Sequence, residues 1–177
     1  PHIAKVEKHA RLAHSIVDDL MLLARGHVRW AEPVLLTDIL TAARSDLSPS
    51  GAPDVALWKD DVTPADLRIG AHPGLSTRLL HALYENAIHA SAPRVPRITT
   101  RARAESERVV VEVGDDGPGI PPQLAARIFD PLVTARPGGT GLGLALARRI
   151  AAAHGGTVEL LESREGAHFR IELPRTA

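Results

Sequence analysis

Asn86 and His89 are the first residues of the chain whose types and spacing could do chemistry. They lie three positions apart in the stretch 75–90, whose apolar residues recur at helical spacing, so both side chains share one face of the expected helix. The amide oxygen of Asn86 could ligate Mg²⁺ beside phosphates, because this hard cation takes oxygen ligands and leaves positions for water and nucleotide. A helical Asn also commonly makes only local hydrogen bonds, so this residue alone decides nothing.

A second group is the run Asp115–Ile120, which reads Asp-Asp-Gly-Pro-Gly-Ile and follows an apolar stretch expected to be a strand. A carboxylate at a strand end can accept a hydrogen bond from the amino group of a base. Gly117 and Gly119 would let the backbone approach a flat ring closely. The alternative interpretation is an ordinary tight turn, because Asp, Gly and Pro are common turn residues.

The third group is the glycine series Gly138–Leu144, which opens onto an Ala-rich stretch expected to be a helix. Glycines expose backbone N–H groups, and the helix N-terminus adds a partial positive charge, so a polyphosphate could bind there. The spacing is GxGxG rather than the GxGxxG of dinucleotide-binding folds, and no GK[ST] phosphate loop is present.

These groups require elements that position them. Hydrophobic periodicity and turn residues predict one layer of helices against one mixed, mostly antiparallel sheet, which is a two-layer α/β sandwich of the α+β class. We expect helices at 37–47, 75–90, 123–128 and 142–154, and strands at 55–59, 67–69, 97–103, 108–113, 157–163 and 167–173.

The first 30 residues have a different pattern. Apolar residues from Ile3 to Ala24 alternate at spacings of three and four, and Leu12, Ile16 and Leu23 widen the stripe, which predicts a long helix that packs in a bundle with more than one neighbour. Gly26 is a helix stop. We therefore divide the chain into a bundle helix, residues 1–30, and a globular domain, residues 31–177.

Composition excludes several classes of protein. The 177 residues, 44% of them hydrophobic, suffice for one domain and an appendage, and the absence of cysteine excludes disulfides, thiol nucleophiles and thiolate metal sites. Balanced charge, 21 basic against 21 acidic residues, with 3% aromatics argues against nucleic-acid binding. The chain also lacks an apolar run of the roughly 20 residues that span a bilayer, so we expect no direct membrane contact.

The three groups taken in order resemble the N, G1 and G2 boxes of the Bergerat-fold ATPases, the superfamily of gyrase, Hsp90, MutL and the histidine kinases. Ile128–Thr134 is similar to the F box of the histidine kinase branch. The run Gly139–Ile150, followed by His154-Gly155-Gly156, resembles the sensor histidine kinases of two-component systems, and the short lid resembles the nitrogen-regulation type. Residues 11–25 resemble the second helix of the dimerisation and phosphotransfer hairpin.

The resemblance implies an ATP-binding catalytic domain that transfers the γ-phosphoryl group of ATP to a histidine for relay to a response regulator receiver domain. It implies a cytoplasmic location, a parent protein that could be membrane-anchored, and a homodimer formed through the helix bundle. Asn86 would hold Mg²⁺ and Asp115 would read the adenine amino group. The implied ATP-binding residues are Asn86, His89, Asp115, Gly117, Gly119, Ile120, Phe129, Thr134, Arg136, Gly139, Thr140, Gly141, Leu142, Gly143 and Leu144, with Arg148 as a further candidate phosphate contact.

The sequence departs from the family pattern in three places. Ala82 stands where kinases carry a second Asn and hydrolysing branches a Glu, which argues against a water-activating hydrolase; Glu85 is interpreted as a surface or outlying residue. Leu132 replaces an F-box aromatic. His2, His9 and His14 lack the phosphoacceptor motif, so we name no catalytic residue and expect the acceptor helix upstream of Pro1.

Two alternatives therefore stay open. The first is a degenerate nucleotide-binding regulatory module without phosphotransfer, which Ala82 motivates. The second is an anti-sigma-type protein serine kinase, which shares the nucleotide-binding fold but lacks the long heptad helix.

Overall fold

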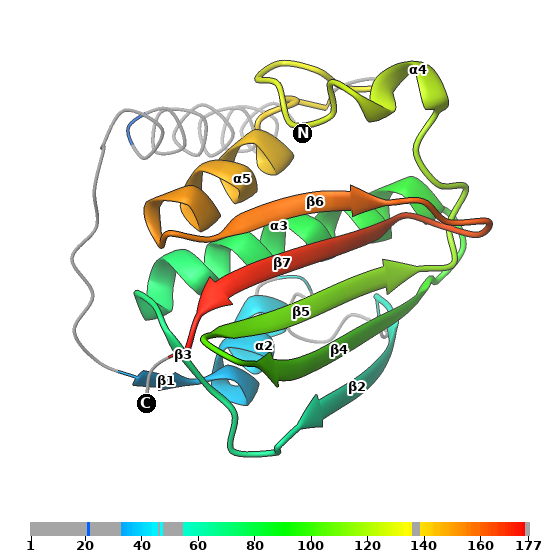
Figure 1. Ribbon diagram of the computed structural model, residues 1–177. Helices are drawn as coiled ribbons and strands as arrows, with labels where there is room; N and C mark the ends of the chain where they lie inside the picture. Colours follow the sequence, from blue (N-terminus) through cyan, green and yellow to red (C-terminus); the bar gives the residue numbers. More distant parts are fainter. Residues whose placement is uncertain (1–20, 22–32, 46, 48–54, 136–138, 176–177) are drawn as a thin grey trace, which may run out of the picture.

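The computed structural model describes residues 21, 33–45, 47, 55–135 and 139–175. Its main part is a two-layer α/β sandwich, in which helices cover one face of a five-stranded sheet (Figure 1). The strands lie in the order β2-β4-β5-β7-β6. Their bounds are Leu57–Thr63 for β2, Arg97–Glu105 for β4, Arg108–Asp115 for β5, Thr157–Leu161 for β6 and His168–Pro174 for β7.

The sheet is mixed and mostly antiparallel, as predicted. β2 pairs with β4 in parallel, and the β4–β5, β5–β7 and β7–β6 pairs are antiparallel. The prediction of a single sheet was wrong. Pro33–Leu35, expected to be a connection, forms β1 and pairs antiparallel with β3 (Arg68–Gly70) in a separate two-stranded sheet. Three residues are too few to show alternation, so the pairing between β1 and β3 left no sign in the sequence, although a strand was expected at 67–69.

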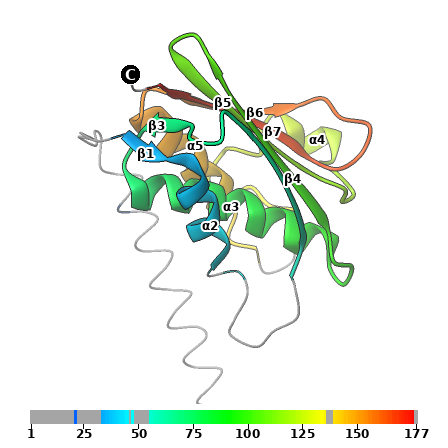
Figure 2. The same cartoon turned by 90° about the horizontal axis from the view of Figure 1, so that it is seen from below.

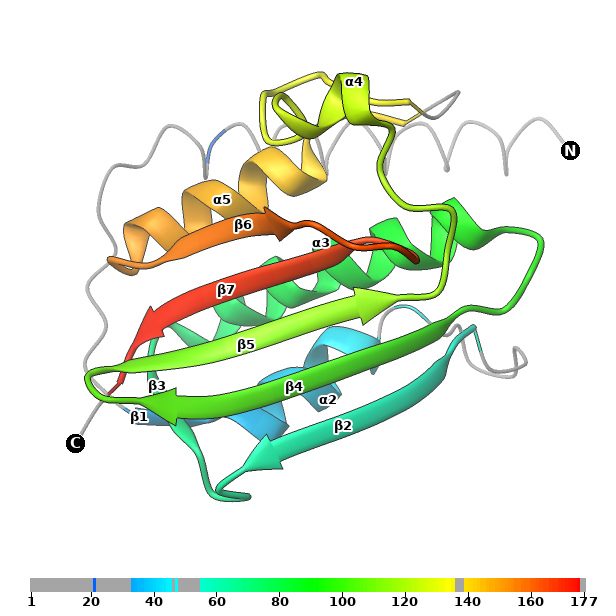
Figure 3. The same ribbon diagram turned by 45° about the vertical axis from the view of Figure 1, so that its right-hand side comes forward.

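The helical layer consists of α2 (Leu36–Ser45), α3 (Pro73–Ser91) and α5 (Gly143–Ala153), which lie on the same side of the sheet (Figure 2). The short α4 (Pro122–Ala125) lies apart from them, beyond the N-terminal end of α5 (Figure 3). Apolar residues of α3 and α5 face those of the central strands, with Leu83, Ile98, Val109, Leu146 and Ile171 all at most 2% exposed. Each such side chain contributes about 1.5–3 kcal/mol through burial.

The helix α3, which carries Asn86, begins two residues earlier than predicted. Pro73 and Gly74 were expected to precede the helix, but Pro73 occupies its first turn, where the missing N–H costs no hydrogen bond. His72 is the N-cap, and its side chain accepts a hydrogen bond from the N–H of Leu75. The helix therefore begins more than two turns before Ala82, its first residue that faces the site.

Two other predicted elements have different bounds. The strand expected at 55–59 runs from Leu57 to Thr63. It continues through its acidic residues because they pair in parallel with β4, and charged residues are common on strands at a sheet edge. The helix expected at 123–128 ends at Ala125 and continues as a turn, with the N–H of Arg127 bonded to the carbonyl of Leu124.

Arg44 joins three elements at the edge of the sheet. Its guanidinium hydrogen-bonds both carboxylate oxygens of Asp60 on β2 at 2.8 and 2.6 Å. It also lies 4.4 Å from the ring centroid of Trp58 and 5.3 Å from that of Tyr84 on α3. The Tyr84 hydroxyl in turn contacts the Thr100 hydroxyl at 2.9 Å. This cluster attaches the edge strand to both α2 and α3.

Several sequence-based expectations lie outside the described residues. These are the helix at 3–24 apart from Met21, the division at residue 30, and Arg136. Among the described residues, no helix is both long and apolar enough to cross a membrane.

His154 joins the C-terminal end of α5 to the start of α3. The side chain is fully buried; Nδ1 lies 2.7 Å from the carbonyl oxygen of Ile150, and Nε2 accepts a hydrogen bond from the backbone N–H of His72 at 2.9 Å. These contacts require neutral imidazole with its proton on Nδ1. Burial lowers the pKa of His154 below its ordinary value.

We predict that His154 makes the fold sensitive to acid. Because its folded-state pKa lies below the unfolded value of about 6.5, the unfolded chain binds the proton more readily as the pH falls. The free energy of unfolding should then decrease below about pH 6.5, by up to about 1.4 kcal/mol per pH unit from this residue. Urea unfolding between pH 7.5 and 5.0 measures it. His154→Gln should give a shallower pH dependence, and equal slopes for both proteins would contradict the prediction.

Candidate functional site

A cavity of about 550 Å³ opens between α3, the loop that follows β5, the turn that follows α4, and the start of α5. This volume is in the range of small-molecule sites. Its lining comes from α3 and from several parts of the stretch 118–144. The lining residues are Ala82, Glu85, Asn86, His89, Ala90, Pro118, Gly119, Ile120, Pro121, Pro122, Leu124, Ile128, Val133, Thr134, Ala135, Gly139, Thr140, Gly141, Gly143 and Leu144.

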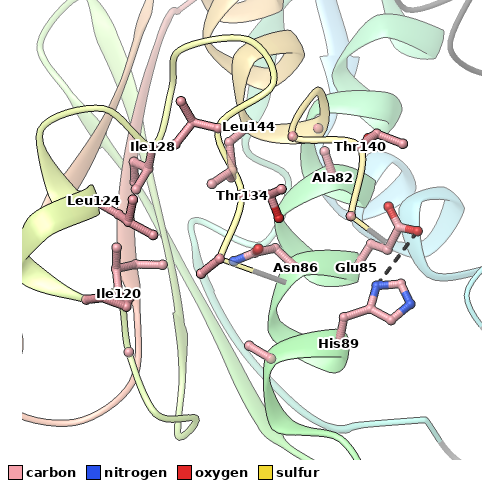
Figure 4. Close-up of a pocket in the computed structure, with 18 of the residues that line it drawn as sticks. Ala82, Glu85, Asn86, His89, Ile120, Leu124, Ile128, Thr134, Thr140 and Leu144 are labelled. Atoms are coloured by element: carbon pink, nitrogen blue, oxygen red, sulfur yellow. Dashed lines mark ion pairs between the residues drawn. The ribbon is translucent and has the colours of Figure 1, made fainter. Parts of the chain in front are cut away.

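The cavity has an apolar side and a polar side (Figure 4). On the apolar side lie Ile120, Leu124 and Ile128, which suit the faces of a flat ring. On the polar side lie Glu85, His89 and Thr140, with Asn86 and Thr134 between the two groups. The arrangement fits a ligand with an aromatic part and a polar, charged part.

The polar side is formed mainly by α3. Asn86 and His89 both line the cavity, as the helical spacing predicted. Glu85 also lines it, with its carboxylate 3.9 Å from Nδ1 of His89. It is an exposed residue, as one of the two interpretations expected, but it faces the cavity. Ala82 is 8% exposed and adds no polar group.

Asp115, at the end of β5, is a buried carboxylate that holds two backbone segments. Its Oδ1 accepts hydrogen bonds from the N–H groups of Gly117 at 2.8 Å and Ala167 at 3.2 Å. Its own N–H donates to the carbonyl of Ala167 at 3.1 Å. Within the described part of the chain both hydrogen bonds to the Asp115 carboxylate are made to Oδ1 and none to Oδ2, so the second oxygen is available for a ligand. Asp115 does not line the cavity as the structure stands.

Two positions close to Asp115 leave too little space for any residue larger than glycine. A Cβ on Gly117 would lie 2.8 Å from Oδ1 of Asp115 and 3.0 Å from the hydroxyl of Ser91. A Cβ on Gly166 would overlap the carbonyl oxygen of Asp115, and Gly166 also has a positive φ of 66°. Gly117 therefore has a steric role, and the loop it belongs to continues into Gly119 and Ile120 of the cavity lining.

Arg94 and Asp116 fix this loop from outside. Arg94 donates to the Asp116 carboxylate at 3.0 Å and to its carbonyl at 2.6 Å, and the N–H of Arg97 donates to the same carboxylate at 2.8 Å. The hydrogen bond from Arg94 lowers the pKa of Asp116. The loop is thus attached to the chain that connects α3 to β4.

At the other end of the cavity, Gly141 lies against the turn at Leu132. Gly141 has φ +66°, and a Cβ there would lie 2.5 Å from the carbonyl carbon of Leu132 and 2.7 Å from the nitrogen of Val133. The Gly141 carbonyl accepts the N–H of Leu132 at 3.0 Å. Gly143 has more space, because its nearest neighbour would be Cβ of Ala82 at 3.8 Å.

The structure brings most of the predicted site residues together. Ten of them line the cavity: Asn86, His89, Gly119, Ile120, Thr134, Gly139, Thr140, Gly141, Gly143 and Leu144. Four do not. Asp115 and Gly117 lie behind the lining, Leu142 is a buried residue, and Phe129 packs edge-on against Phe169 at 6.2 Å between ring centroids.

Sequence reasoning missed several residues that shape the site. Val133, Leu124 and Ile128 form part of its walls, and Gly166 and Ala167 support Asp115 from a turn about 50 positions away. No local signal identifies Gly166, because its requirement arises from a tertiary contact. The ion pair between Arg94 and Asp116 is also a tertiary contact, so no local pattern in the sequence predicts it.

Comparison with known proteins agrees with this geometry. A family model of histidine kinase-, DNA gyrase B- and HSP90-like ATPases matches residues 72–177. The chain belongs to this ATPase family. Residues 72–177 of this ATPase chain correspond to the ATP-binding catalytic domain of sensor histidine kinases, which confirms the resemblance found in the motifs.

The relatives of this ATPase domain are sensor kinases. Sensor histidine kinase ZraS of Salmonella typhi is 34% identical over 169 residues, which cover 94% of this chain and 36% of the relative. The sensory histidine kinase/phosphatase NtrB of Salmonella typhimurium is 32% identical over 132 residues, which cover 69% of this chain and 38% of the relative. The chain thus spans little more than a third of the length of these proteins.

A solved structure extends the likeness to three dimensions. Full-length ShkA in complex with AMPPNP superimposes with a TM-score of 0.82 at 28% identity, covering 99% of this chain and 39% of the other. The α+β class of this ATPase domain, with its mixed sheet and one helical layer, is therefore that of the histidine kinase catalytic domains.

We predict different responses to alanine at Gly141 and Gly143, two glycines of the GxGxG series. Gly141→Ala should lower the free energy of unfolding by about 2 kcal/mol, because the left-handed φ costs about 1–2 kcal/mol and the methyl group contacts the Leu132 backbone. Gly143→Ala, which meets only Ala82 at 3.8 Å, should be neutral or slightly stabilising. Denaturant unfolding of both variants measures the difference. Equal destabilisation would contradict the steric difference between the two positions.

Proposed function

We propose that the cavity binds ATP with Mg²⁺ and that the domain supplies the γ-phosphoryl group for a histidine kinase reaction. The observation that carries the proposal is one cavity with an apolar side and a polar side, lined by Asn86 and by glycines of the GxGxG series, in a chain of this ATPase family. The volume and the chemistry of the walls both fit a nucleotide.

Each part of the cavity has a role in this proposal. The adenine ring packs among Ile120, Leu124 and Ile128, and its amino group donates to the free oxygen of Asp115 after a small movement of the lining. The phosphates lie against the backbone N–H groups of Gly139, Thr140 and Gly141 and the N-terminus of α5. His89 lies on the polar side of the cavity, where its side chain is placed to contact the phosphates.

Asn86 is the proposed Mg²⁺ ligand, because it places an amide oxygen in the cavity between the apolar and polar sides. Bound Mg²⁺ neutralises charge on the phosphate oxygens. Ala82 contributes no ligand, so more of the coordination must come from water and phosphate than in a site with two asparagines. We therefore expect Mg²⁺ to bind this site only weakly when no nucleotide is bound.

In the parent protein we infer a transfer reaction. The bond from the γ-phosphorus to its bridging oxygen breaks, a bond to an imidazole nitrogen of a histidine forms, and ADP and a proton leave. The phosphoryl group then passes to an aspartate of a response regulator receiver domain. Residues 1–30 would contribute to a bundle that pairs two copies, with the catalytic domain in the cytoplasm. Because phosphoryl transfer needs positioning and charge neutralisation more than covalent chemistry, the absence of a side-chain base among the glycines is consistent with this role.

The first test is calorimetric titration of the purified chain with ATP, with and without Mg²⁺. We expect micromolar binding that depends on Mg²⁺, which corresponds to about −8 kcal/mol for a dissociation constant near 1 μM. Absence of binding under both conditions would overturn the proposal and favour a module that has lost its nucleotide site.

We predict that Asp115→Asn weakens ATP binding by about ten- to hundredfold and leaves tripolyphosphate binding unchanged. The amide oxygen of Asn can still accept the N–H groups of Gly117 and Ala167, so the loop keeps its shape. The amide nitrogen, however, cannot accept a hydrogen bond from the adenine amino group. Calorimetry with both ligands measures the difference, with Asp61→Asn on β2 as a matched control for charge. Equal losses for ATP and tripolyphosphate would remove the adenine-reading role of Asp115.

We predict that Ala82→Asn strengthens ATP binding by about three- to tenfold, or ~0.7–1.4 kcal/mol, only when Mg²⁺ is present. The new amide lies one helical turn before Asn86 and beside Gly143, where Cβ of Ala82 would be 3.8 Å from a Cβ on that glycine. Ala90→Asn is the matched control, because it adds an amide one turn after Asn86. An equal gain without Mg²⁺, or an equal gain from Ala90→Asn, would contradict the metal-ligand role of position 82.

A further inference from the structure

The segment Asp130–Ala135 forms the wall of the cavity nearest the proposed phosphate position. Val133, Thr134 and Ala135 line the cavity, so the path of this segment determines the shape of that wall. One backbone hydrogen bond, from Leu132 to Gly141 at 3.0 Å, joins it to the glycine series. Leu132 has φ +67° and is 74% exposed, so its side chain does little to hold the segment in place.

Arg148, in the second turn of α5, contacts Asp130, the first residue of this segment, and Phe129, which precedes it. Its guanidinium carbon lies 5.6 Å from the ring centroid of Phe129, and its Nη2 lies 3.8 Å from Oδ1 of Asp130. The same helix begins at Gly143, which lines the cavity. Arg148 therefore connects the F-box residues to the helix whose N-terminus faces the proposed phosphates.

Arg148 does not itself line the cavity, and its side chain is 51% exposed. Phe129 is held from its other side by Phe169 of β7, and Asp130 is also contacted by Nε of Arg127 at 3.4 Å. The Arg127 contact is local, three residues apart along the chain, and reaches no other element. The contact with Arg148, by contrast, joins residues 129–130 to α5.

We propose that Arg148 is a positioning residue for the nucleotide site. Through its contacts with Phe129 and Asp130 it fixes the position of the cavity wall, residues 133–135, relative to the N-terminus of α5. This inference rests on the proposed function. It replaces the earlier interpretation of Arg148 as a phosphate contact. It also gives Phe129 a role. The ring of Phe129 does not line the cavity, but the guanidinium of Arg148 packs on it.

The consequence is a selective loss of affinity. Without Arg148 the wall loses its side-chain connection to α5 and keeps the backbone hydrogen bond between Leu132 and Gly141. A ligand that touches the wall with its phosphates should therefore bind less tightly. Arg148→Ala should weaken binding of Mg²⁺ and a non-hydrolysable ATP analogue about five- to tenfold, from the combined loss of one exposed ion pair and one cation–π contact. Adenosine, which does not reach the wall, should bind within about twofold of the original affinity, and the unfolding temperature should change little.

Three further variants make the test specific. Arg149→Ala, on the next residue of α5, removes an exposed guanidinium that has no ion pair in the described part of the chain, and it should leave both affinities unchanged. Arg127→Ala removes only the local partner of Asp130 and should also have little effect. Arg148→Lys keeps a positive charge near Asp130 and should restore part of the affinity for the ATP analogue.

Asp130→Asn separates positioning from direct phosphate contact. If Arg148 acts through Asp130, this variant weakens binding of the ATP analogue, and adding Arg148→Ala has little further effect. If Arg148 contacted phosphate directly, removal of the neighbouring carboxylate would leave or strengthen that binding, and the two changes would add.

The measurements, made by calorimetry on the full chain, have distinguishable outcomes. A selective, non-additive loss supports the inference. An unchanged affinity, an equal loss for adenosine, an effect of the same size from Arg149→Ala, or additive effects would each overturn it. If the unaltered chain binds neither ligand, the proposed function itself fails.

Discussion

The carboxylate of Asp115 is the contact on which the geometry of the site depends. One oxygen accepts N–H groups from the loop after β5 and from the residue before β7, so a single side chain fixes the path of two backbone segments that leave adjacent strands. A neutral apolar residue would leave both N–H groups buried without partners, at about 1–3 kcal/mol each. The same carboxylate retains a second oxygen, so structural support and base recognition can coexist in one residue.

The glycines follow from this and from a second close contact. Gly117 and Gly166 leave no room for a Cβ beside Asp115, and Gly141 leaves none beside the Leu132 turn. At both ends of the cavity the backbone therefore approaches another part of the chain more closely than any side chain would allow. The glycines act in this structure as spacers between segments, in addition to their effect on backbone conformation. For this reason glycine is favoured at Gly117 even though its φ is not in the left-handed region.

The sequence predicted the parts of the fold that have local causes. Helical spacing was enough to place Asn86 and His89 on one face of α3, and alternation was enough for β5 and β7, because both signals arise from one buried surface. β1 was missed because three residues carry no period, and β2 was predicted too short because its acidic residues are supported by Arg44 and by parallel pairing with β4. The site was predicted from a resemblance, and its lining extends beyond the motifs: Glu85, Leu124 and Val133 face the cavity because of how distant segments pack, which no local pattern records.

The chemistry at position 82 narrows what the site can do. A hydrolase needs a base that can take a proton from water next to the γ-phosphate. Ala82 has no such group, and its Cβ would lie 3.8 Å from a Cβ at position 143, which is an ordinary van der Waals distance. Glu85 does line the cavity, but its carboxylate is directed toward His89, one turn further along the helix. The site is therefore better suited to holding a nucleotide for transfer to an acceptor supplied from elsewhere than to activating water, and the part of the reaction that needs a nucleophile must come from another element.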